Sequence, residues 1–429
     1  MKNKITIIVL ILALVGGSFW LTRHNPSHHA DIAKDRGLVT VHFANLPYAD
    51  HTITSIGIEK GFFKEVGIDL QAETIKVEEA IPSLVNGKFD AISIPPGIIF
   101  SSLESAPDVI AFVFSDLFQG YALMAQPNAG YRRYSDFVSE GKTHSEAIAA
   151  TIQQVRGKTF AYPAETAIKP FIDKLLSDGS MSAADYKPLV LEDPLTLAAM
   201  RKKEADFQVG GVPSRIQLEK DGFIALISSS DIAKGAKPSS DSTELAAVLQ
   251  NSWATTKEFA QKHPEIIQRL AGVNYRIVQF IKDHESEAAS IHMAYLTKVT
   301  GQEFTEKDAK IIYHSLDPFI TFEDQKPWFH DTQNPFYYQY VNGAILNSFL
   351  AKGMFKSRTP KVDDVIFADN TYRDLEALKS EAEAIIAKTS SKALSAAATS
   401  ELATARERLA AFDFDGALAL AKKASASSK

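Results

Sequence analysis

The chain contains no cysteine among its 429 residues. This absence excludes disulfide bonds, thiolate metal sites, a catalytic cysteine and the lipid-modified cysteine of a bacterial lipoprotein. Basic residues are not in excess either. The chain has 46 Lys and Arg and 52 Asp and Glu, which gives a net charge of −6. Binding to nucleic acid calls for a basic surface. The sequence therefore does not predict a nucleic-acid partner.

The sequence motifs of common catalytic and phosphate sites are also missing. No G-x-x-x-x-G-K-[ST], G-x-S-x-G, H-E-x-x-H or G-x-G-x-x-G sequence is present. Each of these motifs encodes a particular nucleophile, phosphate or metal geometry. The sequence therefore predicts a binding protein rather than an enzyme, with no metal and no cofactor.

The order of elements near the start of the chain indicates an α/β fold. A length of 429 residues with 45% hydrophobic residues is enough for two or three domains. The pattern reads as strands at 39–44, 68–75 and 89–94, helices at 53–60 and 80–86, and polar loops at 45–52 and 95–97. Alternating strands and helices with short loops predict a parallel sheet, whose ligands lie beyond the carboxyl ends of the strands.

Two motifs in this stretch carry a resemblance to a known family. Residues 59–69 read EKGFFKEVGID and residues 84–91 read LVNGKFDA. In this order and spacing they resemble the solute-binding proteins of ABC importers, in the group that takes up nitrate, taurine, alkanesulfonates and thiamine-pyrimidine precursors. The resemblance implies a type II periplasmic binding protein-like fold, in which two doubly wound lobes close over a ligand at a hinge. It also implies an ABC permease as the membrane partner.

A second stretch repeats the order of the first and predicts the second lobe. Strands are expected at 158–162, 189–191 and 206–209, with a further strand at 224–227 returning to the first lobe. Later helices are expected at 245–261, from residue 264 onward, and at 338–351. The predicted divisions are the first lobe at 38–120, the second lobe at 121–223, the return and C-terminal helices at 224–373, and an Ala-rich helical hairpin tail at 374–429.

The N-terminal residues predict export from the cytoplasm. Lys2 and Lys4 precede an uncharged apolar run at 5–22, and Arg23 follows it. Segment 1–23 fits a cleaved signal peptide and a retained anchor about equally, and 24–37 fits a polar linker. Either alternative places the body in the periplasm or on the extracytoplasmic face of the membrane.

Candidate ligand-binding residues come from the four loops expected to face the cleft and from nearby aromatic residues. The first loop also contains Asp50 among its polar residues. Pyrimidine-precursor binders of the family carry a similar P-x-x-D/H-H element, which makes His51 the most suggestive residue. The candidates are Asn45, Tyr48, His51, Thr52, Pro96, Gly97, Phe118, Tyr121, Tyr162, Glu165, Thr166, Gly210, Gly211 and Arg215.

Several candidates have a structural alternative. Thr166 is expected to cap a helix, whose free N–H groups suit an anion. Arg215 fits either a ligand carboxylate, sulfonate or phosphate, or a surface ion pair. Phe118 and Tyr121 fit a planar ligand or an ordinary core.

The leading hypothesis is a solute-binding protein that captures a small organic anion or ring compound and delivers it to a permease. The named ligand classes are sulfonates, nitrate-like anions and pyrimidine precursors. One alternative is a membrane-anchored sensor or assembly module, with a protein partner held by residues 374–429. A third hypothesis is a pyrimidine-synthesising enzyme on the same fold.

Overall fold

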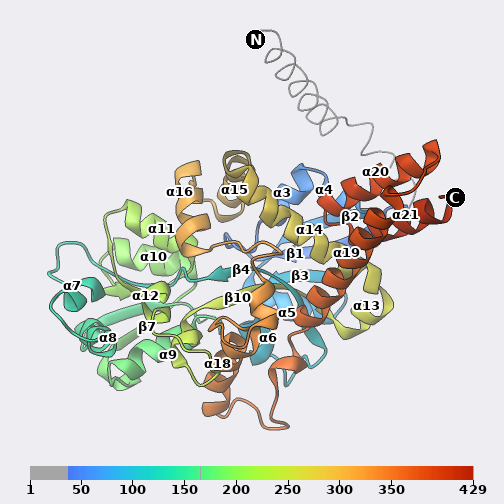
Figure 1. The fold of residues 1–429 in the computed structure, drawn as a ribbon. Coiled ribbons are helices and arrows are strands. Elements are labelled where there is room, and N and C mark those ends of the chain that lie inside the picture. The colour runs from blue at the N-terminus through green and yellow to red at the C-terminus, as the bar shows by residue number, and fades with distance from the viewer. Residues whose placement is uncertain (1–36, 165, 429) are drawn as a thin grey trace, which may run out of the picture.

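The protein consists of two lobes, each built on a five-stranded sheet (Figure 1). The computed structural model describes residues 37–164 and 166–428. The first sheet has the order β2 (Ile68–Thr74), β1 (Val39–Asn45), β3 (Ala91–Ile94), β10 (Leu249–Thr256) and β4 (Val109–Phe118). The second has the order β7 (Lys187–Val190), β6 (Thr159–Tyr162), β8 (Phe207–Gln208), β5 (Ala122–Ala125) and β9 (Ile224–Ser228). The predicted two-lobed α/β fold is confirmed.

The two sheets share one topology. In each, the first three strands in sheet order are parallel, and the last two are joined by antiparallel pairing. The sheets are therefore mixed, whereas the sequence predicted parallel sheets. The antiparallel strands β5 and β10 each enter their sheet directly after the chain has crossed from the other lobe. The chain thus crosses twice between the lobes.

Helices cover both sheets. The first lobe has α3 (Thr54–Glu59), α4 (Phe62–Glu65), α5 (Val77–Val85) and α6 (Pro96–Ser101). The second lobe has α7 (Tyr134–Ser139), α8 (His144–Ile152), α9 (Lys169–Asp178), α10 (Asp193–Arg201), α11 (Val212–Lys220) and α12 (Ser229–Ala233). After β10 come α13 (Lys257–Lys262), α14 (Pro264–Asp283), α15 (Glu285–Thr300), α16 (Glu306–Ile311), α17 (Lys326–His330) and α18 (Tyr338–Ala351). The short helices are η1 (Gln153–Val155), η2 (Ala183–Asp185), η3 (Thr243–Ala247), η4 (Ile312–Leu316) and η5 (Val362–Asp364).

The GFF motif builds the core of the first lobe. Gly61 has a φ of +74°, which lets the chain turn sharply from α3 into α4. Phe63 stacks on Trp253 of β10 with ring centroids 6.3 Å apart. Phe62 packs edge-on against Phe280 of α14. These residues lie in the core and not at the cleft, so the motif identifies the fold and leaves the ligand open.

The helix predicted at 245–261 is wrong. Residues 249–256 form strand β10, between β3 and β4. Its polar side chains have partners within the lobe; Ser252 Oγ, for example, donates to the carbonyl of Ile94 at 2.7 Å. Because both faces of the strand are buried, its apolar residues show no alternation, and the pattern was read as helical. Its neighbour β4, buried along its whole length, was not predicted.

Strand β9 also differs from the prediction. It was expected to return to the first lobe, but it pairs with β5 at the edge of the second sheet. The return to the first lobe comes after it, in the segment that contains α12 and η3. The second lobe therefore extends beyond residue 223.

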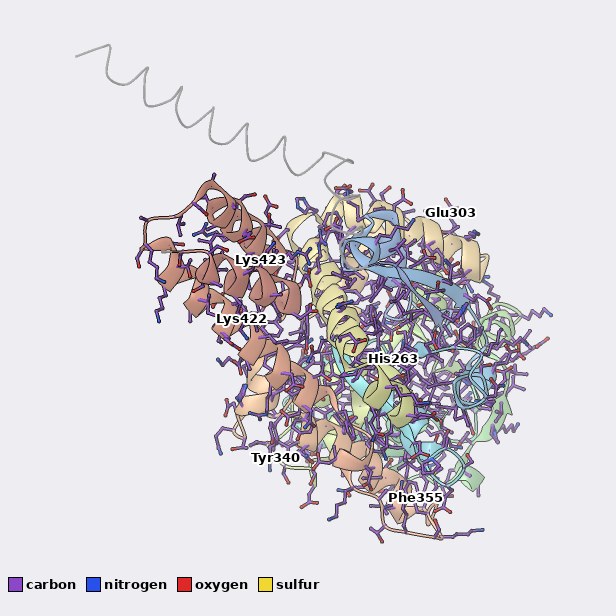
Figure 2. All side chains as sticks on the ribbon, turned by 90° about the vertical axis from the view of Figure 1, so that its right-hand side faces the viewer. His263, Glu303, Tyr340, Phe355, Lys422 and Lys423 are labelled. Carbon is purple, nitrogen blue, oxygen red and sulfur yellow. The ribbon has the colours of Figure 1, made fainter. Side chains whose placement is uncertain are left out.

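The C-terminal residues form three helices where a two-helix hairpin was predicted. The helices are α19 (Ala368–Ser390), α20 (Ala396–Ala410) and α21 (Phe414–Ala426), and they lie on the side of the first lobe that faces away from the second (Figure 1). Figure 2 shows this side, with Lys422 and Lys423 labelled on α21. Phe414 and Tyr372 hold the bundle to the body through contacts with Phe322. A protein partner for this bundle stays a prediction.

The expected export segment, 1–23, and nearly all of the expected linker lie outside the described residues. Within the part of the chain that the structure describes, no helix combines the length and apolar character needed to cross a bilayer.

Candidate functional site

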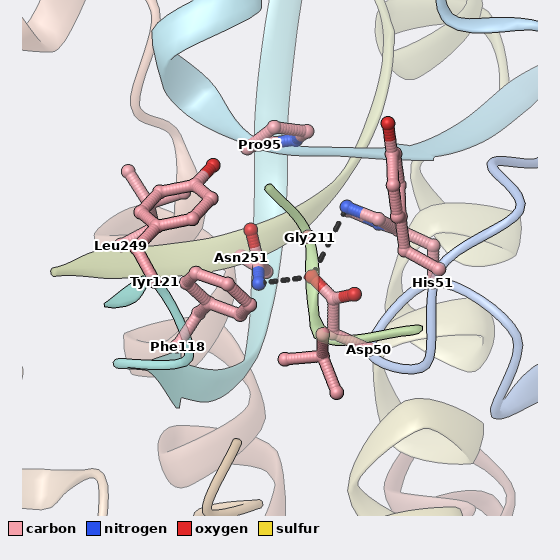
Figure 3. Close-up of a pocket in the computed structure, with 10 residues that line it drawn as sticks. Asp50, His51, Pro95, Phe118, Tyr121, Gly211, Leu249 and Asn251 are labelled. Carbon is pink, nitrogen blue, oxygen red and sulfur yellow. Dashed lines mark hydrogen bonds and ion pairs between the residues drawn. The ribbon is translucent and has the colours of Figure 1, made fainter. Parts of the chain in front are cut away.

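A small cavity lies between the two lobes (Figure 3). Both lobes and both crossing regions contribute to its wall. The lining residues are Tyr48, Asp50, His51, Pro95, Phe118, Tyr121, Gly211, Val212, Leu249 and Asn251. Its volume open to the centres of water molecules is about 20 Å³, which is room for about one water molecule. A larger ligand therefore needs the lobes to move apart or the side chains to rearrange.

One side of the cavity is aromatic. Phe118 ends β4 and Tyr121 follows in the first crossing, and their rings meet edge to face with centroids 4.6 Å apart. Tyr48, in the loop after β1, lies edge-on to His51 with centroids 6.2 Å apart. Such ring faces and edges pack well against a flat ligand.

The other side of the cavity is polar and centred on the carboxylate of Asp50 (Figure 3). His51 Nε2 lies 3.1 Å from Asp50 Oδ2, and His51 Nδ1 lies 2.8 Å from the hydroxyl of Ser93. The amide nitrogen of Asn251 donates to the same Asp50 oxygen. Burial lowers the pKa of His51 to about 3, so the imidazole is neutral at neutral pH and adds no positive charge.

The lobes are in direct contact around the cavity. A Cβ built on Gly211 in the second lobe would lie 2.9 Å from the Tyr48 ring in the first. The hydroxyls of Ser101 in α6 and Thr166 before α9 are 3.0 Å apart. In this arrangement the lobes therefore meet at Gly211 and at Thr166, and we refer to it as the closed form.

The structure brings five of the predicted site residues to the cavity wall, namely Tyr48, His51, Phe118, Tyr121 and Gly211. Asn45, Thr52, Pro96, Gly97, Tyr162, Thr166, Gly210 and Arg215 are not part of that wall. Glu165 lies outside the described residues. Ligand binding by any of these residues stays a prediction.

Candidates from the first lobe that miss the cavity support its wall from behind. Asn45 Oδ1 accepts a hydrogen bond from Thr54 at 3.0 Å. The hydroxyl of Thr52 lies 2.9 Å from Nε2 of His292. Pro96 opens α6, so the cavity is lined by its neighbour Pro95. Gly97 lies close to Ala167 of the second lobe.

Candidates from the second lobe have other partners. Thr166 does not cap α9, because the residue at the cap position is Ile168. Tyr162 lies 3.3 Å from Tyr186, hydroxyl to hydroxyl, beside a different surface hollow. Arg215 pairs with Glu219 at 3.0 Å and donates to the carbonyl of Gly120 at 2.9 Å. Of the two alternatives for Arg215, the ion pair is the one present.

Five wall residues were not among the candidates: Asp50, Pro95, Val212, Leu249 and Asn251. Asp50 was noted as a polar residue of the first loop but was not chosen. Pro95 and Val212 adjoin predicted loop residues and could have been included with them. Leu249 and Asn251 were missed because β10 was read as a helix. The sequence did contain a signal for the strand. Residues 250–252 are amide and hydroxyl residues inside an otherwise apolar stretch, and such a run is unusual for the buried face of an amphipathic helix.

Comparisons with known proteins show the fold. No family model and no curated protein sequence matches the chain. Among solved structures, it is similar to the periplasmic sulfonate-binding protein SsuA from Methylobacillus flagellatus KT, with a TM-score of 0.53 and 15% identity over 80% of this chain and 96% of that one. The aliphatic sulphonate-binding SsuA from Escherichia coli gives 0.54 and 10%, with 76% and 91% covered.

The nitrate-binding protein NrtA from Synechocystis PCC 6803 gives a TM-score of 0.56 and 14% identity, over 80% of this chain and 89% of that one. Between 89% and 96% of each of these three chains is matched by this one. The chain therefore has the periplasmic binding protein-like fold that the sequence predicted. At such identities the likeness extends to the fold and not to the ligand.

Proposed function

We propose that this protein is the extracytoplasmic solute-binding protein of an ABC importer, and that it captures a small ring compound carrying N–H donors. The lobes would close over the ligand and present it to the membrane permease. The fold shared with sulfonate- and nitrate-binding proteins of periplasmic transport supports the general role. The lining of the cavity carries the choice of ligand.

That lining contains three aromatic rings and the Asp50 carboxylate, and no Lys or Arg. A sulfonate or nitrate ion calls for positive charge or several N–H donors. Here His51 is neutral, and Arg215 points its guanidinium at Glu219 and Gly120. Asp50 instead offers an acceptor to the amino group or protonated nitrogen of a ring. Of the classes expected from the sequence, an aminopyrimidine fits best.

The test compares ligand classes on the full chain in the presence of a chelator. Aminopyrimidines are expected to raise the melting temperature, since a ligand that binds only the folded state stabilises it by mass action. Alkanesulfonates and nitrate are expected to have little effect. Tight binding of either anion, together with no response to ring amines, would contradict the proposal.

A substitution then tests the role of the cavity. Asp50→Asn keeps the shape but removes the charge, so the dissociation constant for the ring amine should rise by about ten- to a hundredfold. Asp241→Asn changes an exposed carboxylate far along the chain and is the matched control. Equal affinities of the two variants would show that Asp50 does not recognise the ligand.

A further inference from the structure

Three carboxylates meet directly behind the polar side of the cavity. They belong to Asp50 in the loop after β1, Asp116 in β4, and Asp317 just after η4. One oxygen from each lies within 4.8 Å of the other two. The backbone explains the meeting, because Leu117 N–H donates to the carbonyl of Pro318 at 3.1 Å and so holds residues 316–320 against β4.

All three carboxylates are shielded from solvent. Asp116 and Asp317 are 0% exposed and Asp50 is 4% exposed. Within the described part of the chain, no Lys or Arg forms an ion pair with Asp116 or Asp317. Buried carboxylates this close repel one another strongly unless a proton or a cation lies among them.

Asp317 supplies an observation that is independent of the clustering. Neither of its carboxylate oxygens accepts a hydrogen bond from any described residue, although both are buried. Buried polar atoms in folded proteins are almost always paired. Its one side-chain partner is the carboxyl group of Asp116, so these buried oxygens have no donor group from the rest of the described protein and are suited to a shared proton or cation.

Asn251 supplies a second observation. Its amide nitrogen contacts both Asp50 and Asp116, while its amide oxygen is buried without a partner. Rotation of the amide by half a turn exchanges the two atoms. The oxygen would then lie beside both carboxylates, a position that is favourable when a proton or a cation lies among them.

We propose that Asp50, Asp116 and Asp317, with the amide oxygen of Asn251, bind a hard divalent cation, and that calcium is the ion that fits best. Carboxylate and amide oxygens are the ligands that calcium prefers, at about 2.3–2.6 Å. Two such ligand oxygens lie at most about 5 Å apart, in accord with the spacing in this cluster. Magnesium holds its water ligands more firmly, and this buried cluster leaves little room for them.

The ion has a structural and a functional consequence. It connects the loop after β1 to β4 and to residues 316–320, so it stabilises the folded first lobe. It also fixes the carboxylate of Asp50, which lines the ligand cavity. The site does not depend on the proposed function, because the ion would bind when the ligand cavity is empty.

In the absence of the ion a proton takes its place. Burial and the adjacent carboxylates of Asp116 and Asp50 raise the pKa of Asp317 well above its usual value.

The experiment uses the full chain, freed of metal with a chelator and with no organic ligand present. Calorimetry with calcium chloride is expected to show one ion bound per chain. The melting temperature is expected to rise with calcium concentration. Magnesium is expected to bind more weakly than calcium.

Asp317→Asn is the informative variant, because it keeps the size of the side chain and imitates the protonated acid. Its calcium affinity is expected to fall by at least about a hundredfold, while the metal-free protein stays folded. Asp193→Asn removes another carboxylate with a raised pKa, which has Ser214 and Gly211 as donors, and should leave calcium binding intact.

Two results would overturn the proposal of a calcium site. Absence of any calcium effect on wild-type melting temperature and heat of binding up to about 10 mM, beyond the range of extracellular calcium modules, would show that a proton alone occupies the cluster. Unchanged calcium binding by Asp317→Asn would place the ion elsewhere. The calcium experiment contains no ring amine. If ring amines fail to bind in the separate ligand test, that result contradicts the proposed function and leaves the calcium site unaffected.

Discussion

Gly211 lies where the two lobes meet, and its substitution can test whether that contact matters for ligand binding. Its φ of −68° is accessible to any residue, so only the contact with Tyr48 requires glycine. Gly211→Ala should act as a wedge in the closed form, with an overlap that costs about 1–3 kcal/mol. We expect ligand affinity to fall by about ten- to a hundredfold, measured by calorimetry, with the melting temperature of the empty protein nearly unchanged.

The neighbouring glycine provides the contrast. A Cβ on Gly210 would overlap the side chains of Gln208 and Asp193, both in the second lobe. Gly210→Ala should therefore lower the stability of that lobe in the empty protein. If Gly211→Ala lowered stability in the same way without weakening the ligand, its contact with Tyr48 would have no part in closure.

His292 gives a pH dependence whose sign follows from its burial. It lies between Thr52 and the hydroxyl of Tyr313, 3.0 Å from the latter, and desolvation lowers its pKa from 6.5 to about 4. The unfolded chain then binds more protons below pH 6.5. Stability from this group is complete above pH 6.5 and is lost as the pH falls to 4, by at most about 3 kcal/mol.

Urea unfolding between pH 4 and 7 measures this effect. His292→Gln keeps hydrogen-bonding capacity without a titrating ring, so its stability should change less with pH than that of the wild type. His314→Gln, at an exposed histidine, should leave the wild-type profile in place. Parallel curves for wild type and His292→Gln would refute this account of the acid sensitivity.

Single residues could be predicted where chemistry and loop position agree. Tyr48, His51 and Gly211 were found because they follow strand ends in a recognisable α/β pattern. The capping role expected for Thr166 is wrong, because Ile168 has the cap position and the Thr166 hydroxyl lies beside Ser101. Arg215 has Glu219 and the carbonyl of Gly120 as partners, and ligand binding by either residue stays a prediction. Asp116 and Asp317 could not be paired from sequence, because 201 positions of chain separate them.

At the scale of elements, most strands of the two sheets were predicted, including the short buried strands β3 and β8, but the two longest buried strands, β4 and β10, were not. Strands β1 and β2 are near the edge of their sheet and show partly exposed positions. Strands β4 and β10 are buried on both faces, so they lack the alternation that reveals a strand. The polar side of the cavity includes Asn251 of β10. Because β10 was predicted as a helix, Asn251 was not among the predicted site residues.

The docking of the C-terminal helices can be tested at one position of α14. A Cβ on Gly272 would overlap the backbone carbonyl of Phe412, between α20 and α21. Backbone cannot yield as a flexible side chain does, so Gly272→Ala should cost about 1–3 kcal/mol, more than the gain of alanine in a helix. We expect faster proteolysis between α19 and α20 and a lower urea midpoint.

Arg269→Ala is the matched change on the same helix. It removes the ion pair of Arg269 with Asp415, 3.2 Å apart, and a pair near the surface contributes less than about 1 kcal/mol. Proteolysis of the tail should therefore change little. An equal effect of the two variants would mean that charge, and not close backbone packing, holds the tail.

At the scale of the whole molecule, two crossings join the like sheets, so the closure that we propose would be a hinge motion about them. The first crossing, at residues 119–121, carries Tyr121 into the cavity wall, and Arg215 holds it through the carbonyl of Gly120. The second carries the chain back into β10, which contributes Asn251. The two crossings are thus next to the residues that line the cavity, so in the proposed mechanism an occupied cavity would favour closure.

The natural absence of cysteine makes this coupling directly testable. The hydroxyls of Ser101 and Thr166 meet across the lobes at 3.0 Å, which makes these two positions the place for an engineered disulfide between the lobes. The double variant Ser101→Cys with Thr166→Cys should form one bond that locks the closed form. Oxidised after addition of a bound ring amine, it should retain the ligand through extended dialysis; oxidised before addition, it should fail to take the ligand up.

Reduction should restore ordinary exchange in both preparations, and each single variant should behave as the wild type. These controls separate the lock from any effect of the substitutions themselves. Ligand exchange that is equally fast in the oxidised and reduced double variant would show that the ligand enters without separation of the lobes. Because no other thiol is present in the chain, any change on reduction must come from this one contact between the lobes.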